Sequence, residues 1–159
     1  MKQILVIDDQ DDLRSVIVAS LNFGGYDVSE ASNGRAGILM LLEQKPDLIL
    51  CDVRMPEMDG YRTLAAIRQV PGTAAIPFIL MTGSVDRDEF RRAMVCGADD
   101  YLMKPFSPRE LLEAVKSRLA RVTHVRSDAY EQIERTRERL CGTFSLSAIP
   151  AQVAAAAAA

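Results

Sequence analysis

The sequence has no tryptophan, a single histidine, three scattered cysteines and no long hydrophobic run. The one histidine, His124, excludes a metal site built from several imidazoles. Cys51, Cys96 and Cys141 form no Cys-x-x-Cys pair, so we expect a reduced, cytoplasmic setting. No apolar run approaches the roughly 18 residues of a transmembrane helix. Residues 1–5 lead directly into a strand pattern without the features of a signal peptide.

A strong charge of one sign is also missing. The formal net charge of -3 predicts no general attraction to nucleic acid or to an anionic membrane. We therefore expect this chain to make no direct contact with nucleic acid or with a membrane. Its 159 residues, of which 48% are hydrophobic, suit one compact domain and an appendage.

The stretch at residues 46–60 organises the rest of the chain. Four apolar residues, Leu48 to Cys51, run directly into Asp52, and turn-forming residues follow at once. A short apolar run bounded by turn residues is typical of a strand buried on both faces. Ligands of such sheets collect at the carboxyl ends of the strands, so Asp52 is predicted to lie at the mouth of a site. The alternative is an aspartate that only forms the turn at the strand exit.

Apolar strands and amphipathic helices alternate five times over residues 1–120. The expected strands lie at 4–7, 26–31, 48–51, 77–81 and 101–103. Such alternation predicts parallel strands joined by right-handed crossovers, with helices on both faces of the sheet. Five strands favour the flavodoxin-like order 2-1-3-4-5, with the second strand at an edge. The predicted fold class is therefore α/β, a doubly wound five-stranded parallel sheet.

The helical segments give finer expectations. An aspartate of the pair Asp11-Asp12 is expected to cap the first helix. Leu39 and Leu42 are assigned to the apolar face of the second helix, and Ala65 to the inward face of the third. Residues 107–110 predict a strong helix start, with serine at the cap, proline at the first position and glutamate three residues on.

Polar side chains follow four of the five strands. In the order 2-1-3-4-5 these four strands are neighbours, so their polar ends are expected to converge on one edge of the sheet. The converging set is Asp8, Asp9, Asp52, Thr82 and Lys104. Clustered carboxylates need a cation at neutral pH, and oxygen ligands with room for water favour Mg²⁺. Aspartate can form an acyl phosphate, while a lysine and a hydroxyl stabilise a transferring phosphoryl group. The alternative is a solvated acidic rim with an incidental Lys–Asp ion pair.

Five short motifs mark residues 1 to about 120. They are Asp8-Asp9, Asp52-Val-Arg-Met-Pro56-x-Met-Asp59-Gly60, Thr82-Gly83, Gly97-Ala98-Asp99-Asp100-Tyr101 and Lys104-Pro105-Phe106. Together they resemble the receiver domain of two-component signalling, the response-regulator fold of the chemotaxis receiver protein.

This resemblance implies a role for each residue of the acidic site. Asp52 would be the phosphoacceptor. The carboxylates of Asp9 and Asp52 and the backbone carbonyl of Arg54 would hold Mg²⁺, and Asp8 would act mainly through water. Lys104 would contact the phosphoryl group.

The resemblance also implies a conformational switch. Thr82 would move to hydrogen-bond the phosphoryl group, and Tyr101 would turn inward on activation. The peptide bond before Pro105 is expected to be cis. The fourth helix, fifth strand and fifth helix, residues 84–119, would form the face that reads out the state. The alternative for Tyr101 is a half-buried strand tyrosine that does not move.

The predicted function is a switch that accepts a phosphoryl group on Asp52 from a histidine kinase or a phosphotransfer protein and then changes its partner or dimer contacts. It would modify only itself, so no enzyme acting on an external metabolite is expected. An aspartyl-phosphate phosphatase would carry a second acid at position 54, which is Arg54, and a substrate cap. A nucleotide or flavin binder would need a glycine-rich loop where Asp8 and Asp9 lie. A receiver used only for docking is disfavoured by the complete set of acids, threonine and lysine.

The end of the chain carries a weaker pattern. Apolar spacing by three and four continues through Val115, Leu119, Val122, Arg126, Ala129, Ile133, Thr136 and Leu140, a heptad seam weakened by Arg126 and Thr136. Residues 121–141 are interpreted as a helical linker and candidate coiled coil, either as one extended C-terminal helix or with a break at Ser127-Asp128. A homodimer would use this helix or the face at 84–119. Residues 142–159 are interpreted as an irregular or low-complexity tail.

Overall fold

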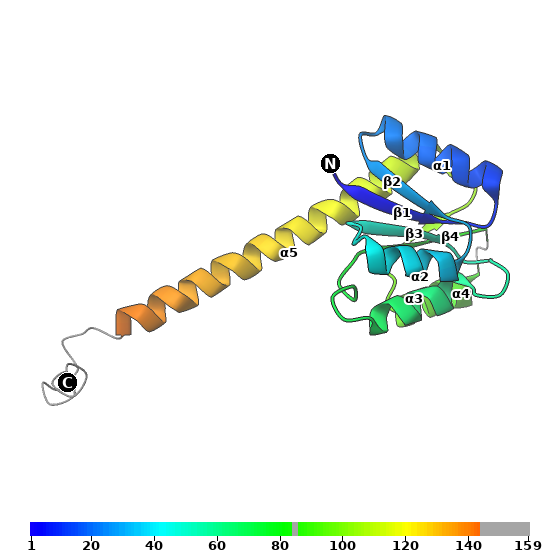
Figure 1. Ribbon diagram of the computed structural model, residues 1–159. Coiled ribbons are helices and arrows are strands. Elements are labelled where there is room, and N and C mark those ends of the chain that lie inside the picture. The colour runs from blue at the N-terminus through cyan, green and yellow to red at the C-terminus, as the bar shows by residue number, and fades with distance from the viewer. Residues whose placement is uncertain (84–85, 144–159) are drawn as a thin grey trace, which may run out of the picture. The chain divides into compact units, whose positions relative to one another are not determined.

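The structure is a computed structural model that describes residues 1–83 and 86–143 (Figure 1). The strands are β1 Gln3–Ile7, β2 Asp27–Ala31, β3 Leu48–Asp52, β4 Phe78–Thr82 and β5 Asp100–Met103. The helices are α1 Asp11–Phe23, α2 Gly34–Glu43, α3 Gly60–Gln69, α4 Arg87–Val95 and α5 Pro108–Thr143. The chain divides into two compact units, of which the first is Met1–Arg121 and the second begins at Val122.

The five strands form one parallel sheet in the order β2-β1-β3-β4-β5. This confirms the predicted doubly wound α/β fold and the edge position of β2. Every residue of β3 and β4 is buried, whereas β2 is buried only at Ala31. The uninterrupted apolar runs therefore mark the interior strands, because both faces of these strands are covered.

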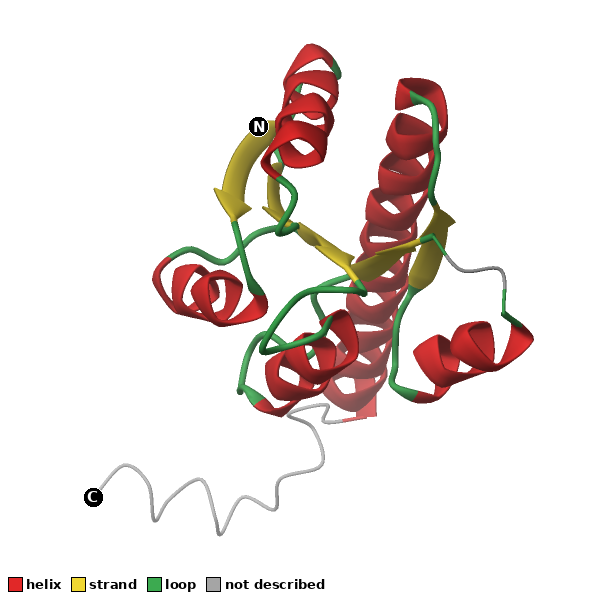
Figure 2. Ribbon diagram, turned by 90° about the vertical axis from the view of Figure 1, so that its right-hand side faces the viewer, coloured by secondary structure: helices red, strands yellow, loops and turns green. Residues whose placement is uncertain are grey.

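Helices cover both faces of the sheet (Figure 2). Side chains of α1 and of the first turns of α5, including Ile17 and Val115, pack on one face with Leu50 of β3. Side chains of α2, α3 and α4 pack on the other face, where Ile49 and Cys51 of β3 point. Successive residues of β3 thus enter opposite cores, as the two-residue period of a strand requires.

Side chains cap four of the five helices at their first turns. Asn33, Asp59 and Asp86 each accept a hydrogen bond from a backbone N–H at the start of α2, α3 and α4, respectively. The predicted start of α5 is confirmed as a reciprocal capping box. There the Glu110 amide donates to the Ser107 hydroxyl, and the Ser107 amide donates to the Glu110 carboxylate.

The expected cap of α1 is wrong. The helix starts at Asp11 itself, and the residue before it, Gln10, makes no side-chain cap. The Gln10 amide instead donates to Oδ1 of Asp8 at 2.9 Å. Asp11 and Asp12 therefore lie in the first turn, where their charges interact favourably with the helix dipole.

Three expected inward side chains are exposed. Leu39 and Leu42 are 59% and 60% exposed, and Ala65 is also exposed. In α2 the inward face is taken by Gly34, Gly37 and Leu41. A Cβ atom at Gly37 would collide with the side chain of Ile7 in β1, so this helix lies very close to the sheet. That close approach fixes its rotation and turns Leu39 and Leu42 outward.

α5 is one continuous helix through Thr143, so the alternative of a break at Ser127-Asp128 is not what the structure has. Residues 144–159, which include most of the expected irregular tail, lie outside the described part of the chain. Among the described helices, none combines the length and the apolar character needed to cross a membrane.

Candidate functional site

The carboxyl ends of β1, β3 and β5 bring one lysine between two aspartates. Asp8 follows β1 directly, Asp52 ends β3, and Lys104 follows β5. The Lys104 ammonium donates to Oδ2 of Asp8 at 2.9 Å and to Oδ1 of Asp52 at 2.6 Å. Residues 96 positions apart in the sequence are therefore joined, as the predicted strand order requires.

Both aspartates are removed from water. Asp8 is completely buried, and Asp52 is 4% exposed. Their remaining oxygens accept backbone hydrogen bonds, Oδ1 of Asp8 from the Gln10 amide and Oδ2 of Asp52 from the Arg54 amide at 3.0 Å. A buried carboxylate needs such partners because an unpaired one is costly to desolvate.

Burial and pairing shift the ionisation of the central pair. Burial raises the pKa of the Asp52 carboxyl above its usual value, and hydrogen bonding to Lys104 opposes this only in part. Burial also acts to lower the pKa of Lys104, but its hydrogen bonds to Asp52 and Asp8 prevail and raise that pKa above its ordinary value. The lysine is consequently held in its charged form at neutral pH.

A third acid completes the cluster. One carboxylate oxygen from each of Asp8, Asp9 and Asp52 lies within 4.8 Å of the others. Oδ1 of Asp9 is buried and has no hydrogen-bond partner among the described residues. Three carboxylates lie beside a single lysine, and one buried oxygen, Oδ1 of Asp9, has no donor among the described residues. These oxygen ligands fit a hard divalent cation such as Mg²⁺.

The loop between β3 and α3 is folded tightly against the end of β3. The Gly60 amide donates to the carbonyl of Val53 at 3.0 Å, and a Cβ atom at Gly60 would collide with the backbone oxygen of Asp52. Met55 is buried, whereas the Arg54 side chain is exposed. The glycine is therefore required by this close approach, and the loop keeps the backbone of Arg54 beside the Asp52 carboxylate.

Thr82 and Tyr101 lie on the neighbouring strands. Thr82 is buried at the end of β4, and its carbonyl accepts the backbone amide of Lys104 at 2.6 Å. Tyr101 lies opposite Leu80 in the sheet register and is half-buried on the α2–α4 face. The structure thus places Thr82, at the end of β4, next to the backbone of Lys104. Tyr101 lies in β5, three residues before Lys104. The peptide bond between Lys104 and Pro105 is cis, as expected.

Arg14 supports the site from α1, although no motif or spacing in the sequence points to it. Its guanidinium donates to the backbone carbonyl of Asp8 at 2.7 Å and forms ion pairs with Asp11 and Glu30. The side chain is only 13% exposed. Arg14 therefore anchors the start of α1 to the end of β1. No spacing rule predicts this contact, because it depends on how the helix turns away from the sheet.

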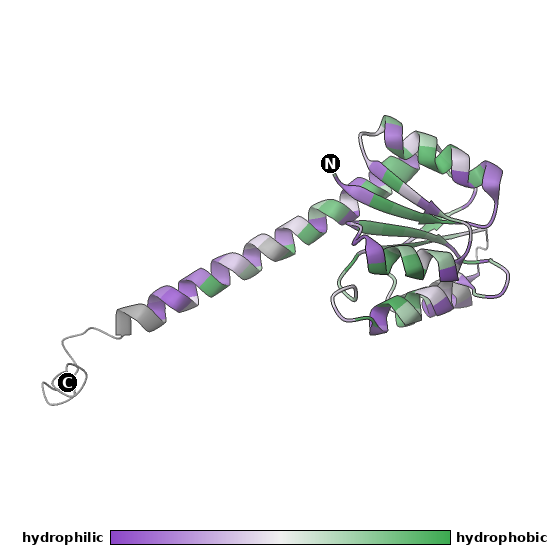
Figure 3. Cartoon of the chain, viewed as in Figure 1, coloured by the Kyte–Doolittle hydropathy of each residue, from purple (hydrophilic) through white to green (hydrophobic). Residues whose placement is uncertain are grey.

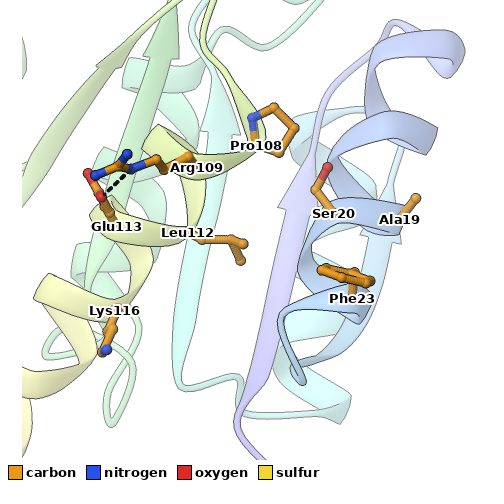
Figure 4. Close-up of a pocket in the computed structure, with 8 residues that line it drawn as sticks. All are labelled: Ala19, Ser20, Phe23, Pro108, Arg109, Leu112, Glu113 and Lys116. Carbon is orange, nitrogen blue, oxygen red and sulfur yellow. Dashed lines mark hydrogen bonds and ion pairs between the residues drawn. The ribbon is translucent and has the colours of Figure 1, made fainter.

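A hollow of about 600 Å³ lies apart from the acidic cluster, between α1 and the first turns of α5 (Figure 4). Its lining residues are Ala19, Ser20, Phe23, Pro108, Arg109, Leu112, Glu113 and Lys116. None of these residues belongs to the site at the strand ends.

Comparison with known proteins agrees with this geometry. The model of the response regulator receiver domain matches residues 4–116. The phosphate regulon transcriptional regulatory protein PhoB of Pseudomonas aeruginosa is 37% identical over 120 residues, which are 76% of this chain and 52% of that protein. The chemotaxis protein CheY4 of Vibrio cholerae superposes with a TM-score of 0.72 at 28% identity, covering 74% of this chain and 98% of that one.

A further neighbour contains a metal. The receiver domain of the sensor histidine kinase PA1611 from Pseudomonas aeruginosa, with a magnesium ion coordinated in its active site cleft, superposes with a TM-score of 0.70. It is 29% identical, and the match covers 75% of this chain and 98% of that one.

The curated relatives are longer than this chain. The chain spans about half the length of the curated relatives it matches. These include transcriptional regulators, one of them described as DNA-binding, so the expectation that this chain makes no nucleic acid contact gains no support. The matched region contains β2 to β5, all of β1 except its first residue, and every residue of the acidic cluster. The chain belongs to the response regulator receiver domain family.

Proposed function

We propose that this chain is a phosphorylation-controlled switch that accepts a phosphoryl group on Asp52 in a Mg²⁺-dependent reaction. The observation that carries the proposal is the shared lysine: Lys104 bridges the buried carboxylates of Asp8 and Asp52. The unpartnered oxygen of Asp9 beside them supports a metal at the same place. Such a constellation serves phosphoryl transfer better than it serves stability, because buried like charges are costly.

The chemistry needs little beyond placement. One oxygen of Asp52 attacks phosphorus while the phosphorus–nitrogen bond of a phosphohistidine donor breaks, and the electron pair leaves on the imidazole nitrogen. Asp9, Asp52 and the Arg54 carbonyl would hold Mg²⁺, with Asp8 reaching it through water. When bound, the ion neutralises charge on the phosphoryl oxygens.

Lys104 and Thr82 are the donors for the new group. The Lys104 ammonium, now 2.6 Å from Asp52, would transfer one of its hydrogen bonds to a phosphoryl oxygen. The Thr82 hydroxyl, at the end of the neighbouring strand, would donate another. Movement of Thr82 would leave room for Tyr101 to turn inward and would alter the face formed by α4, β5 and the start of α5.

The partner that supplies the phosphoryl group is a histidine kinase or a phosphotransfer protein, as it is for receiver domains in general. The chain itself would catalyse only its own phosphorylation and dephosphorylation. The free thiols of Cys51 and Cys96 support a reducing compartment, the cytoplasm, as its place of action.

The test is intact mass spectrometry after incubation with Mg²⁺ and acetyl phosphate, a small phosphodonor. The wild type is expected to gain one phosphoryl group, and Asp52→Asn none. Asp59→Asn is the matched control, because it removes a nearby carboxylate outside the cluster and keeps an oxygen that can cap α3. Labelling of Asp52→Asn equal to the wild type, or failure of the wild type to label with Mg²⁺ bound, would overturn the proposal.

A further inference from the structure

The second unit begins as a helix whose described side chains are largely exposed. From Val122 onward α5 continues to Thr143, and Val125, Tyr130 and Ile133 are 63%, 72% and 62% exposed. A helix of about 20 residues is marginal in water unless tertiary packing covers an apolar face. Figure 3 shows short hydrophobic stretches among hydrophilic ones along this part of α5. Three large exposed hydrophobic residues on one such helix favour a covering surface.

These residues fall into one heptad register. If Ile133 takes position a, then Leu140 is also at a, and Val122, Ala129 and Thr136 are at d. Tyr130 then takes position e and Val125 takes position g. All three of the large exposed hydrophobic residues thus lie on the seam of a coiled coil or at its two borders.

Two acids on the opposite side of the helix form ion pairs with arginines of the same helix. Glu131 forms an ion pair with Arg135 at 3.6 Å, and Glu134 forms one with Arg137 at 3.1 Å. These acids occupy the outer positions f and b. These two acids need no charge from a second chain, whereas the exposed hydrophobic residues of the seam and its borders are left uncovered.

We propose that residues 122–140 pair with a second copy of this chain as a parallel, in-register, two-stranded coiled coil. Position g of one helix then meets position e of the next heptad on the other. This places Val125 against Tyr130 of the second copy, and Gln132 against Arg137 of the second copy. Neither contact joins like charges, and the first is apolar, so the helix is complementary to itself in this arrangement.

Position 126 sets the strength of the pair. It is an a position of the seam and is occupied by arginine. A polar residue at one a position costs stability but fixes the register and the number of strands. The apolar contacts of Val125 and Tyr130 border this layer on both sides. The dimer is therefore weak and depends on concentration, which suits a contact that can be modulated. The proposal concerns the second unit and does not depend on phosphorylation of Asp52.

The first test is sedimentation equilibrium of the full chain over a range of concentrations. Arg126→Leu is expected to lower the dimer dissociation constant at least tenfold, and Ile133→Asp to raise it at least tenfold. Ser127→Asp, which adds the same charge at an outer position, is the matched control and should change it less than twofold. Circular dichroism checks that each variant keeps its helix content. A wild type that is monomeric at every concentration, or equal effects of Ile133→Asp and Ser127→Asp, would overturn the proposal.

The second test fixes the orientation. In the full chain with Cys96 and Cys141 replaced by serine, Val122→Cys places a thiol at the start of the seam, and His124→Cys places one at an outer position. Mild oxidation should cross-link the first variant into a disulfide-bonded dimer and leave the second monomeric on a non-reducing gel. An antiparallel pair would hold the two Val122 positions at opposite ends. Light scattering of the same sample measures whether it is dimeric. A dimer that forms no cross-link through Val122→Cys would overturn the parallel arrangement.

Discussion

Lys104 neutralises the two buried carboxylates of Asp8 and Asp52. Its removal should show how much their repulsion destabilises the fold when no metal is bound. We predict that Lys104→Met lowers the free energy of unfolding by about 2 kcal/mol in EDTA, because two desolvated charges lose their counter-ion. Millimolar Mg²⁺ should reduce the difference in unfolding free energy between Lys104→Met and the wild type, because a bound divalent cation can neutralise the same carboxylates. Urea unfolding of both proteins with and without Mg²⁺ measures this. A penalty that is the same in both conditions would contradict the prediction.

Glu57, in the loop that follows Asp52, has a left-handed backbone with φ of 64°. A side chain with a Cβ atom is disfavoured in this conformation. We predict that Glu57→Gly raises the free energy of unfolding by about 0.5–1 kcal/mol, after allowance for the greater freedom of glycine in the unfolded chain. Urea unfolding is again the measurement.

Glu57→Ala is the control for that prediction. It removes the same carboxylate but keeps the Cβ atom, so it should give no stabilisation. If both variants gain stability equally, the gain comes from the lost charge and not from relief of backbone strain.

The residues that gather at the strand ends could be predicted because each follows an apolar run, and a parallel sheet aligns such ends. Asp8, Asp52 and Lys104 were found in this way, and the structure joins them through hydrogen bonds. The hydrogen bond from Arg14 to the carbonyl of Asp8 was not foreseen. It depends on the path of the chain between β1 and α1, for which the sequence carries no periodic signal.

At the scale of elements, Asp47 fastens β1 to the start of β3. Its carboxylate accepts hydrogen bonds from the Lys2 ammonium at 2.7 Å and the Gln3 amide at 2.9 Å. Partial burial acts to raise the pKa of Asp47, but these two hydrogen bonds prevail and lower it below its usual value. A depressed carboxyl pKa stabilises the fold above the unfolded-state pKa, and this stabilisation is lost as the pH falls through the folded-state value.

We therefore predict that Asp47→Asn is less stable than the wild type at pH 7 by a few tenths of a kcal/mol, since Lys2 is half exposed and its ion pair is screened. The difference should begin to shrink below about pH 4, where the carboxyl becomes protonated in the unfolded chain, and should disappear as the pH falls through the lower folded-state pKa of Asp47. Thermal unfolding of both proteins at pH 7, 5 and 3 measures it. A difference that stays constant over this range would show that the ionised form of Asp47 contributes nothing.

Hydrophobic spacing predicted each strand and helix of the first unit but not the rotation of every helix. Leu39 and Leu42 have the spacing of an inward face, yet they are exposed because Gly37 brings α2 against Ile7. A glycine carries no hydropathy signal, so a pattern based on apolar residues cannot find the face that it defines. The rotation of α2 is decided by how closely Gly37 approaches the sheet. This distance is known only once the structure of the sheet is known.

At the scale of the whole molecule, the strand order followed from alternation and length, whereas the continuity of α5 did not. Ser127-Asp128 offers a plausible cap for a new helix, and the apolar spacing runs through the same point. Local preference and the heptad pattern therefore gave opposite answers. The structure has one helix through this point, in agreement with the heptad pattern.

The first unit should carry the switch chemistry by itself. Residues 1–121 contain all five strands, both hydrophobic clusters and the whole acidic site. We predict that a chain ending at Arg121 takes up phosphoryl from acetyl phosphate within twofold of the full-length rate. Its free energy of unfolding should lie within about 0.5 kcal/mol of the full-length value, because distant, independent parts contribute additively.

Mass spectrometry and urea unfolding of the shortened and complete chains, compared at one concentration below the dimer dissociation constant, measure both quantities. If the shortened chain labels slowly while folding normally, the second unit influences the acidic site, and dimerisation and phosphoryl uptake would be coupled. If the rate of phosphoryl uptake and the free energy of unfolding are the same for both chains, the first unit carries out the phosphoryl chemistry without influence from the second. The helix could then transmit the state of Asp52 only through contacts that change after phosphorylation, since reciprocal coupling requires each event to alter the free energy of the other.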